Sequence, residues 1–240
     1  MNPNNALYAC GAILLGVIGI VFHDFAMQWQ PVPAGFPIRT PLAYVSGLIL
    51  IIGGAAMLSP KGERAGAWLL TVFLGLWTLT LNLPAAIASY THIGSWNSPA
   101  EIAFMTMGGL ALVSSSAGAL RSTLARIARI VAGLSACVFG FAHFNYIDFT
   151  ASMVPAWIPP NGVFWAWATG AGHLAAGLAL VSGIRARLAA TLLAVMMASF
   201  VVLLHLPRVV AAPDSHVEWI MLGVSSMLAG AAWLLRKYAT

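Results

Sequence analysis

The sequence predicts an all-α integral membrane protein with eight transmembrane helices, arranged as two parallel-repeat four-helix bundles. Hydrophobic residues make up 60% of the 240 residues and charged residues only 7%, whereas about 25% of the residues in an average soluble domain are charged. The apolar residues form continuous runs of about 20 residues, which is the length of a helix that crosses a ~30 Å hydrocarbon layer. A transmembrane barrel would show shorter segments with alternating apolar and polar residues.

Clusters of polar residues, proline and glycine divide the chain into eight apolar segments. The segments cover residues 6–28, 42–58, 64–84, 100–118, 127–149, 162–181, 186–206 and 216–235.

The basic residues indicate how these segments cross the membrane. All Lys and Arg residues except Arg39 and Arg208 lie in every second connection or at the C-terminus. The positive-inside rule therefore predicts a protein of the inner membrane with both termini in the cytosol. The net charge of +5 marks topology here, so we expect the lipid bilayer as partner and no nucleic acid.

The chain also contains an internal repeat. At an offset of 123 residues, Gly47 aligns with Gly170, and Leu81, Leu83 and Pro84 align with the Leu and Pro residues of the segment 204–207. At offsets of 120 and 117, His23 aligns with His143 and Glu101 aligns with Glu218.

Each repeat holds four segments, and four crossings return the chain to its starting side. The two units, residues 1–120 and 121–240, are therefore predicted to be parallel repeats related by an axis along the membrane normal.

Four features of the second unit occur together. His143 and Phe144 lie late in its first segment, "VPAWIP" connects this segment to the next, "TGxGHxxxG" opens the second segment, and "HLP" closes the third. Over about residues 127–235, and more weakly in the first unit, the chain resembles the DoxX-like family of small four-helix membrane proteins. The resemblance implies a role near membrane redox systems, such as the membrane subunits of thiosulfate:quinone oxidoreductase. Where members of the family commonly carry Glu, this chain has His173, and Leu50 in the first unit.

Polar side chains inside apolar segments are the candidate functional residues, because a charge near the bilayer centre costs about 2.5–3.5 kcal/mol. His143, His173, His205 and Glu218 come from the four segments of the second unit. The sequence predicts that they line a polar pocket in the outer half of the second bundle and are its catalytic candidates. The alternative is that they only form hydrogen bonds between helices.

Two kinds of cofactor are compatible with these residues. Neutral imidazoles on facing helices bind metal ions or a b-type haem, although no residue is assigned as a metal ligand. A quinone needs hydrogen bonds at its oxygen atoms and an aromatic environment, which histidine, carboxylate and aromatic side chains supply. The candidate cofactor-binding residues are Phe144, Trp165, Trp167, His23, Asn82 and Glu101.

The sequence therefore indicates a membrane component of a redox system that interacts with quinone and with a peripheral or membrane redox enzyme. The competing interpretation is a non-enzymatic scaffold or a small-molecule or proton-coupled carrier. Enzymatic activity of the chain itself is left open. The absence of a phosphate-binding loop with Lys-Ser or Lys-Thr argues against nucleotide-driven transport.

Overall fold

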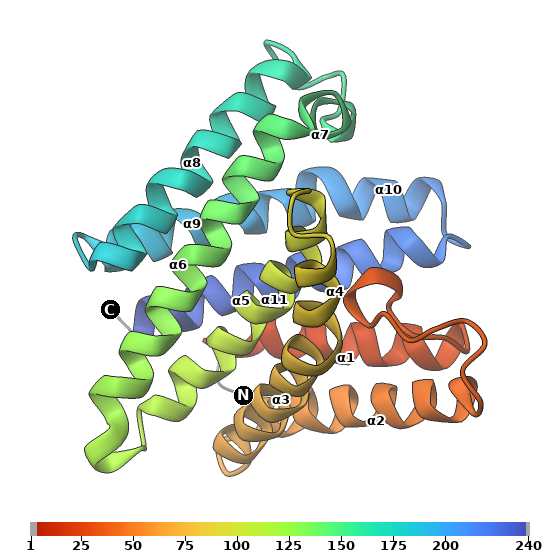
Figure 1. The fold of residues 1–240 in the computed structure, drawn as a ribbon, viewed down its shortest axis with the longest axis vertical. Helices are drawn as coiled ribbons and strands as arrows, with labels where there is room; N and C mark the ends of the chain where they lie inside the picture. The colour runs from red at the N-terminus through yellow and green to blue at the C-terminus, as the bar shows by residue number, and fades with distance from the viewer. Residues whose placement is uncertain (1–3, 239–240) are drawn as a thin grey trace.

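The computed structural model describes residues 4–238. Residues 1–3 and 239–240, the outer ends of the two predicted units, lie outside the described residues. The described part contains helices and no strand (Figure 1), so the prediction of an all-α fold is confirmed. The main helices are α1 (Ala6–Val21), α2 (Arg39–Leu58), α3 (Glu63–Trp77), α4 (Leu83–Ala88), α5 (Gly94–Ser114), α6 (Arg121–Asn145), α7 (Ile147–Met153), α8 (Gly162–Ser182), α9 (Ala186–Phe200), α10 (Leu206–Ala211) and α11 (His216–Tyr238).

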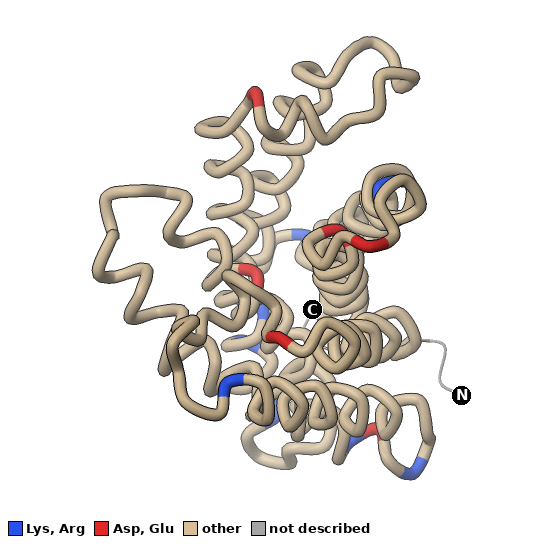
Figure 2. Tube along the Cα trace, turned by 90° about the vertical axis from the view of Figure 1, so that its right-hand side faces the viewer, with Lys and Arg blue, Asp and Glu red and all other residues tan. Residues whose placement is uncertain are grey.

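Six helical segments in the described residues are long and apolar enough to cross a membrane. The helix α1 is apolar but has only 16 residues, and α5 is not among the six. Large hydrophobic side chains lie exposed on these segments; Val210, for example, is 74% exposed. Charged residues are few along the whole chain (Figure 2). Such a surface requires a lipid bilayer around it. The six segments are Arg39–Leu58, Glu63–Ala88, Gly118–Asn145, Gly162–Ser182, Ala186–Ala211 and His216–Tyr238.

The first helix is shorter than the apolar segment 6–28. It ends at Val21 because the next residues turn the chain, with His23 in a left-handed conformation at φ 58°. The Asp24 carboxylate accepts a hydrogen bond from the Phe25 amide at 2.7 Å, which holds this turn.

Two spans continue past a proline that the sequence suggested as their end. The π-helical segments Thr78–Asn82 (η2) and Val201–His205 (η4) join α3 to α4 and α9 to α10. In each segment a backbone amide donates to the carbonyl five residues earlier, Leu83 to Thr78 and Leu206 to Val201. The proline that follows lies in the first turn of the next helix, where its missing N–H breaks no helical hydrogen bond. The spans therefore run on to Ala88 and Ala211.

Helices pack in the same order in the two halves of the chain. The helix α1 packs on α2, α2 on α3 and α3 on α5, while α6 packs on α8, α8 on α9 and α9 on α11. The halves meet where α1 packs on α11, α5 on α6 and α5 on α11. In Figure 1 the connections α5–α6 and α8–α9 lie on the left with both termini, and the connections α1–α2 and α10–α11 lie on the right.

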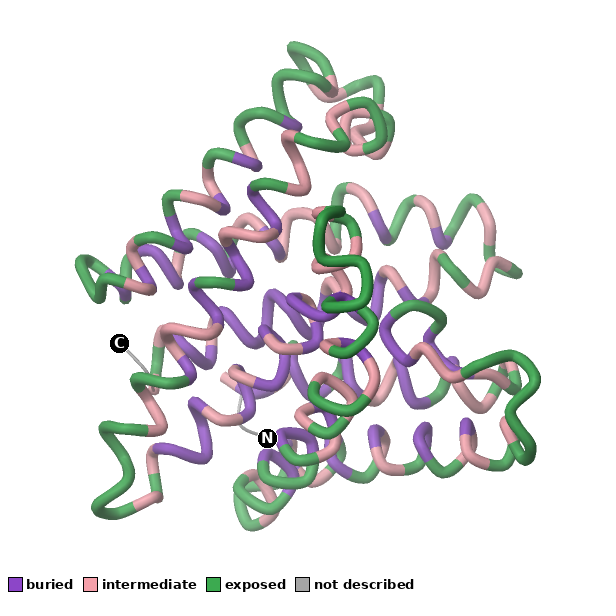
Figure 3. Tube along the Cα trace, in the orientation of Figure 1, coloured by how far each residue is buried: buried purple, intermediate pink, exposed green. Residues whose placement is uncertain are grey.

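The centre of the protein is formed by α5 and α11, each of which carries more buried residues than any other helix (Figure 3). In the most apolar 18 residues of α11, 67% are buried, compared with 28–44% in the same length of the other five candidate spans. The Tyr8 side chain of α1 is buried against both helices and donates a hydrogen bond to the Met105 carbonyl at 2.8 Å.

Glycines bring two pairs of helix backbones into contact. Between α1 and α2, a Cβ atom added at Gly47 would lie 2.7 Å from the carbonyl oxygen of Gly16. Between α6 and α8, a Cβ atom added at Gly140 would lie 2.8 Å from the carbonyl oxygen of Gly170. No larger residue fits either contact without a backbone shift, so the glycines fix the register of both pairs.

This register differs from the offset of 120 residues that pairs His23 with His143. In the two glycine contacts, Gly140 lies 124 residues after Gly16, whereas Gly170 lies 123 residues after Gly47. His23 lies beyond the end of α1, whereas His143 lies inside α6. The two histidines therefore do not occupy equivalent positions.

Candidate functional site

The α6–α8 contact brings two of the predicted site residues together. His143 on α6 and His173 on α8 have ring centroids 4.8 Å apart, with a tilt of 43° between the rings. The His173 side chain is buried and the His143 side chain is half-buried. Gly170 makes room for this pair, because a Cβ atom there would lie 3.0 Å from Cβ of His143.

Both imidazoles are held in the same way by their own helices. Nδ1 of His143 lies 2.8 Å from the Phe139 carbonyl oxygen, and Nδ1 of His173 lies 2.8 Å from the Thr169 carbonyl oxygen. A carbonyl oxygen only accepts hydrogen bonds, so each Nδ1 must carry the proton. In the neutral rings Nε2 then has a lone pair and no hydrogen, so each ring offers one acceptor.

Aromatic side chains surround the histidine pair. Phe139 lies edge-on to His173 at 5.7 Å, and Phe200, the last residue of α9, lies 6.2 Å from the same ring. Phe144 and Trp167 stack on each other at 4.8 Å, with Trp167 on the exposed surface of α8. The predicted aromatic environment of the pair is therefore formed by Phe139 and Phe200, together with the Phe144–Trp167 stack one helical turn away.

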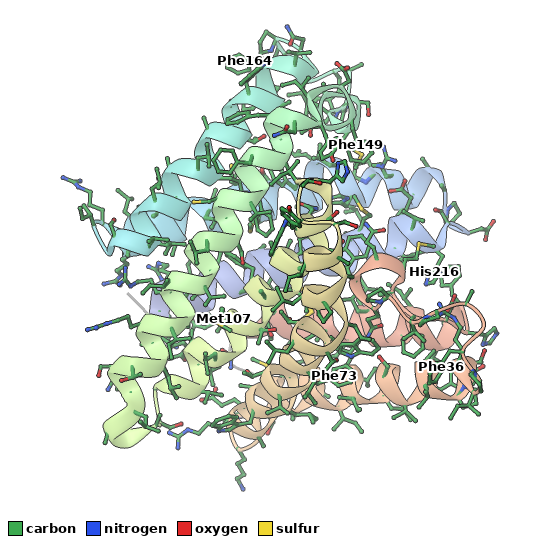
Figure 4. All side chains as sticks on the ribbon, viewed as in Figure 1. Phe36, Phe73, Met107, Phe149, Phe164 and His216 are labelled. Carbon is green, nitrogen blue, oxygen red and sulfur yellow. The ribbon has the colours of Figure 1, made fainter. Side chains whose placement is uncertain are left out.

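Trp165 lies apart from this group. Its ring meets Phe164 edge-on at 5.3 Å, and its indole N–H donates to the Pro159 carbonyl at 2.8 Å. It thus anchors the connection before α8. In Figure 4 Phe164 and Phe149 are labelled at the far end of the α6–α8 pair, near α7.

The other two catalytic candidates lie where the π-helix η4 and α10 pack on α11. Arg208 makes two hydrogen bonds to Glu218, from Nε to Oε2 at 2.9 Å and from an Nη atom to Oε1 at 2.6 Å. His205 is buried and within electrostatic range of Glu218, and its Nδ1 has no hydrogen-bond partner in the described residues. Glu218 is therefore the partner of an arginine.

The four candidates do not meet at one point. Within residues 4–238, no three His, Cys, Asp or Glu side chains are close enough together to hold a metal ion. The structure instead contains two separate pairs, His143 with His173 and Glu218 with Arg208.

The candidates in the first half form a polar network around Trp29. The Trp29 indole N–H donates to the Glu101 carboxylate, which also accepts from Asn97 at 3.3 Å. The Trp29 carbonyl accepts from the buried Asn82 side chain at 3.2 Å. His23 is outside this network, because its Nδ1 lies 2.6 Å from the Tyr44 hydroxyl.

Two residues of these networks were not candidates from the sequence. Arg208 was named only as one of two basic residues outside the basic connections, and Trp29 was not named as a site residue. The ten-residue spacing between Arg208 and Glu218 crosses a connection, so no helical periodicity marks the pair. The signal that was available is that Arg208 is one of two basic residues on the side predicted to carry few of them.

The DoxX family model matches residues 124–206. Over these residues the chain is similar to the DoxX family. The match confirms the resemblance over the segment that carries the histidine–aromatic pair, the connection before α8 and the glycine pattern around His173. The chain has no match among the curated proteins or the solved structures.

The matched segment begins inside α6, contains α7, α8, α9 and η4, and ends at the first residue of α10. His143 and His173 thus lie together inside the matched segment. His205 lies at its edge, and Glu218 lies beyond it on α11.

Proposed function

We propose that this protein is the membrane component of a redox system and binds the head group of a quinol at His143 and His173. The observation that carries the proposal is that two adjacent imidazoles in the segment similar to the DoxX family both have Nδ1 committed to a helix carbonyl. The pair therefore offers two acceptors to a ligand. A quinol carries hydroxyl donors, while the oxidised quinone carries only acceptors, so the reduced form fits this pair better.

The surroundings of the pair support a flat, apolar ligand. Phe139 and Phe200 contact the His173 ring, and the exposed Trp167 stacks on Phe144 beside them. Aromatic rings prefer offset-stacked or edge-on neighbours, and a quinol ring at this position would find both. A ligand with an isoprenoid tail would reach the pair from the bilayer.

The experiment is a binding titration of a short-chain quinol on the purified protein. Binding is followed by isothermal calorimetry, with the corresponding quinone measured in parallel. We expect His143→Ala and His173→Leu to weaken quinol binding about tenfold or more, as expected for a lost hydrogen bond from a buried site. The matched control is His92→Ala, because His92 is an exposed histidine in the α4–α5 connection. Quinol binding that is unchanged in both variants, or quinone that binds as tightly as quinol, contradicts the proposal.

We further propose that the chain is a tandem duplication with eight transmembrane helices. The helix α2 begins at Arg39 and α8 at Gly162, and the π-helices begin at Thr78 and Val201; both pairs are 123 residues apart. The last turns of α2 and α8 also accept similar hydrogen bonds. The Asn5 side chain donates to the Met57 carbonyl of α2, and the Arg129 side chain donates to the Leu180 carbonyl of α8. The first unit then covers residues 1–120 and the second covers residues 121–240. In this arrangement α1 and α5 also cross the membrane.

We place the protein in the inner membrane with both termini in the cytosol. The support is the position of the basic residues, since Lys61, Arg121 and Arg185 lie at connections on one side of the predicted spans. Both termini lie on the same side as the connections α5–α6 and α8–α9 (Figure 1).

A carrier function is the second candidate, and the two π-helices favour it. Such segments occur mostly at functional positions, and here each lies inside a membrane span and ends with a buried polar residue, Asn82 or His205. A flux of protons or small molecules into protein-containing liposomes, without binding of quinol, would support a carrier.

A further inference from the structure

An apolar groove lies beside the start of α1, between α9 and α11. It has a volume of about 220 Å³ and runs between the start of α1, the middle of α9 and the end of α11. Three alanines form part of its surface where α9 and α11 approach each other. The lining residues are Asn4, Leu7, Ala194, Val195, Ala198, Ala229 and Trp233.

The groove lies along a membrane-facing surface. Val195 is 60% exposed and Leu7 is 38% exposed, so both line the groove at positions that lipid reaches. Ala194 and Ala198 are one helical turn apart on α9, and Thr191 lies one turn below Ala194. The groove thus follows α9 from Ala194 to Ala198, about 6 Å, the rise of four helical residues.

A basic side chain lies at the end of the groove that Trp233 lines. Arg236 donates to the Thr191 hydroxyl at 3.1 Å, and its guanidinium lies over the Trp233 ring at 4.4 Å. Lys237 is the next residue on α11 and is exposed. Arg187, also exposed, lies one turn before Thr191, whose hydroxyl donates to the Arg187 carbonyl. Arg236 thus lies beside the lining residue Trp233, with Lys237 near it in the sequence of α11 and Arg187 near its partner Thr191 in the sequence of α9.

We propose that this groove binds one anionic phospholipid, with an acyl chain along Ala194 and Ala198 and the head group beside Arg236, Lys237 and Arg187. The apolar lining fits a hydrocarbon chain, and the cations at its end fit a phosphate group with net negative charge. Basic residues next to a membrane-facing groove on the cytoplasmic side are a known pattern of anionic head-group binding. The Trp233 indole holds Arg236 at the head-group level and donates to the Asn4 side chain, so it fixes the end of the groove.

The test is native mass spectrometry of the protein released from vesicles that contain equal amounts of phosphatidylglycerol and phosphatidylcholine. We expect one retained phosphatidylglycerol molecule per chain. Ala198→Phe fills the groove and should abolish retention, while the matched control Ala175→Phe adds the same side chain on the exposed surface of α8 and should not. If Ala198→Phe does not fold, Val195→Trp at the exposed edge of the groove replaces it.

The charge of the head group is tested separately. We expect Lys237→Gln to weaken retention of phosphatidylglycerol about fivefold, and Arg236→Gln with Lys237→Gln to weaken it further. Lys237→Arg keeps the charge and should retain the lipid. Lys61→Gln is the matched control, because Lys61 lies in the α2–α3 connection, away from the groove. Equal retention of phosphatidylcholine, retention in the Ala198→Phe variant, or a dimer in place of a lipid adduct would overturn the proposal.

Discussion

His143 and His173 face each other across the α6–α8 contact with ring centroids 4.8 Å apart. Each ring donates its Nδ1 hydrogen to a carbonyl of its own helix. The helices therefore select the tautomer of both rings, and Nε2 of each ring is the atom that remains for a ligand. A hydrogen bond that merely ties two helices together would join a donor on one ring to an acceptor on the other. Here each ring bonds to its own helix instead.

The tautomer of the pair is directly measurable. We expect the side-chain nitrogen resonances of His143 and His173 to show the neutral form with the hydrogen on Nδ1, because both Nδ1 atoms face carbonyl oxygens. The measurement is nuclear magnetic resonance of protein with nitrogen-15-labelled histidine, and single His→Gln variants assign the signals. Exposed His92 serves as the reference for a solvated ring. A hydrogen on Nε2 of either ring would contradict the acceptor-pair model.

Replacement of the interface glycines should destabilise the protein. A Cβ atom at Gly177 would lie 2.7 Å from the Gly133 carbonyl oxygen, and one at Gly54 would lie 2.6 Å from the Ala9 carbonyl oxygen. We expect Gly177→Val and Gly54→Val each to cost about 1–3 kcal/mol, because an overpacked helix contact must move apart.

The free energy of unfolding in detergent with added denaturant checks this prediction. The control is Gly35→Val in the α1–α2 connection, where an added Cβ atom meets no other atom within 4 Å. A loss of stability in the control equal to that at Gly177 would show that the effect does not arise from helix packing.

The ion pair of Arg208 and Glu218 should contribute modestly to stability. Two hydrogen bonds join the groups, but the Arg208 side chain is 40% exposed, so solvent screens the attraction. We expect a coupling free energy of about 0.5–1 kcal/mol from a double-mutant cycle with Arg208→Gln and Glu218→Gln. The coupling should fall as the salt concentration rises. A coupling near zero would mean that the pair does not hold α10 on α11.

The number of spans is open to a labelling experiment. We consider four variants, each with one added cysteine: Lys61→Cys, Ser116→Cys, Ser95→Cys and Asp214→Cys. If α1 and α5 cross the membrane, the first two cysteines lie on one side of the membrane and the last two on the other. We expect a membrane-impermeant thiol reagent to label only the second pair in intact cells, in a background without Cys10 and Cys137. Labelling of Ser95 and Ser116 from the same side would contradict eight crossings.

Much of the fold follows from the sequence because membrane helices are set by length and hydropathy. The segments 162–181 and 186–206 begin at the same residues as α8 and α9. The ends were harder to predict. The segment 100–118 is observed as Gly94–Ser114, since the hydroxyl groups of Ser114, Ser115 and Ser116 bond to carbonyls three residues earlier and compete with a further helical turn.

The candidate site was predictable only in part. The sequence grouped His143 and His173 in one pocket with His205 and Glu218, and only the first two lie together, where Gly170 allows the two backbones to approach. The pairing of Glu218 with Arg208 does not follow from the sequence, since its geometry depends on how a π-helix and a connection turn α10 onto α11. Helical periodicity gives no information about contacts of this kind.

The contact between α1 and α11 has a consequence for biosynthesis. The helix α1 leaves the ribosome well before α11, so the surface of α1 that packs on α11 has no partner until α11 has been made. During that interval Gly11, which lies against Met227 and Gly223 of α11 in the folded protein, has no helix beside it. A ribosome that stops before α11 therefore leaves a product that lacks one of its two central helices, and such a product would be a substrate for membrane proteases.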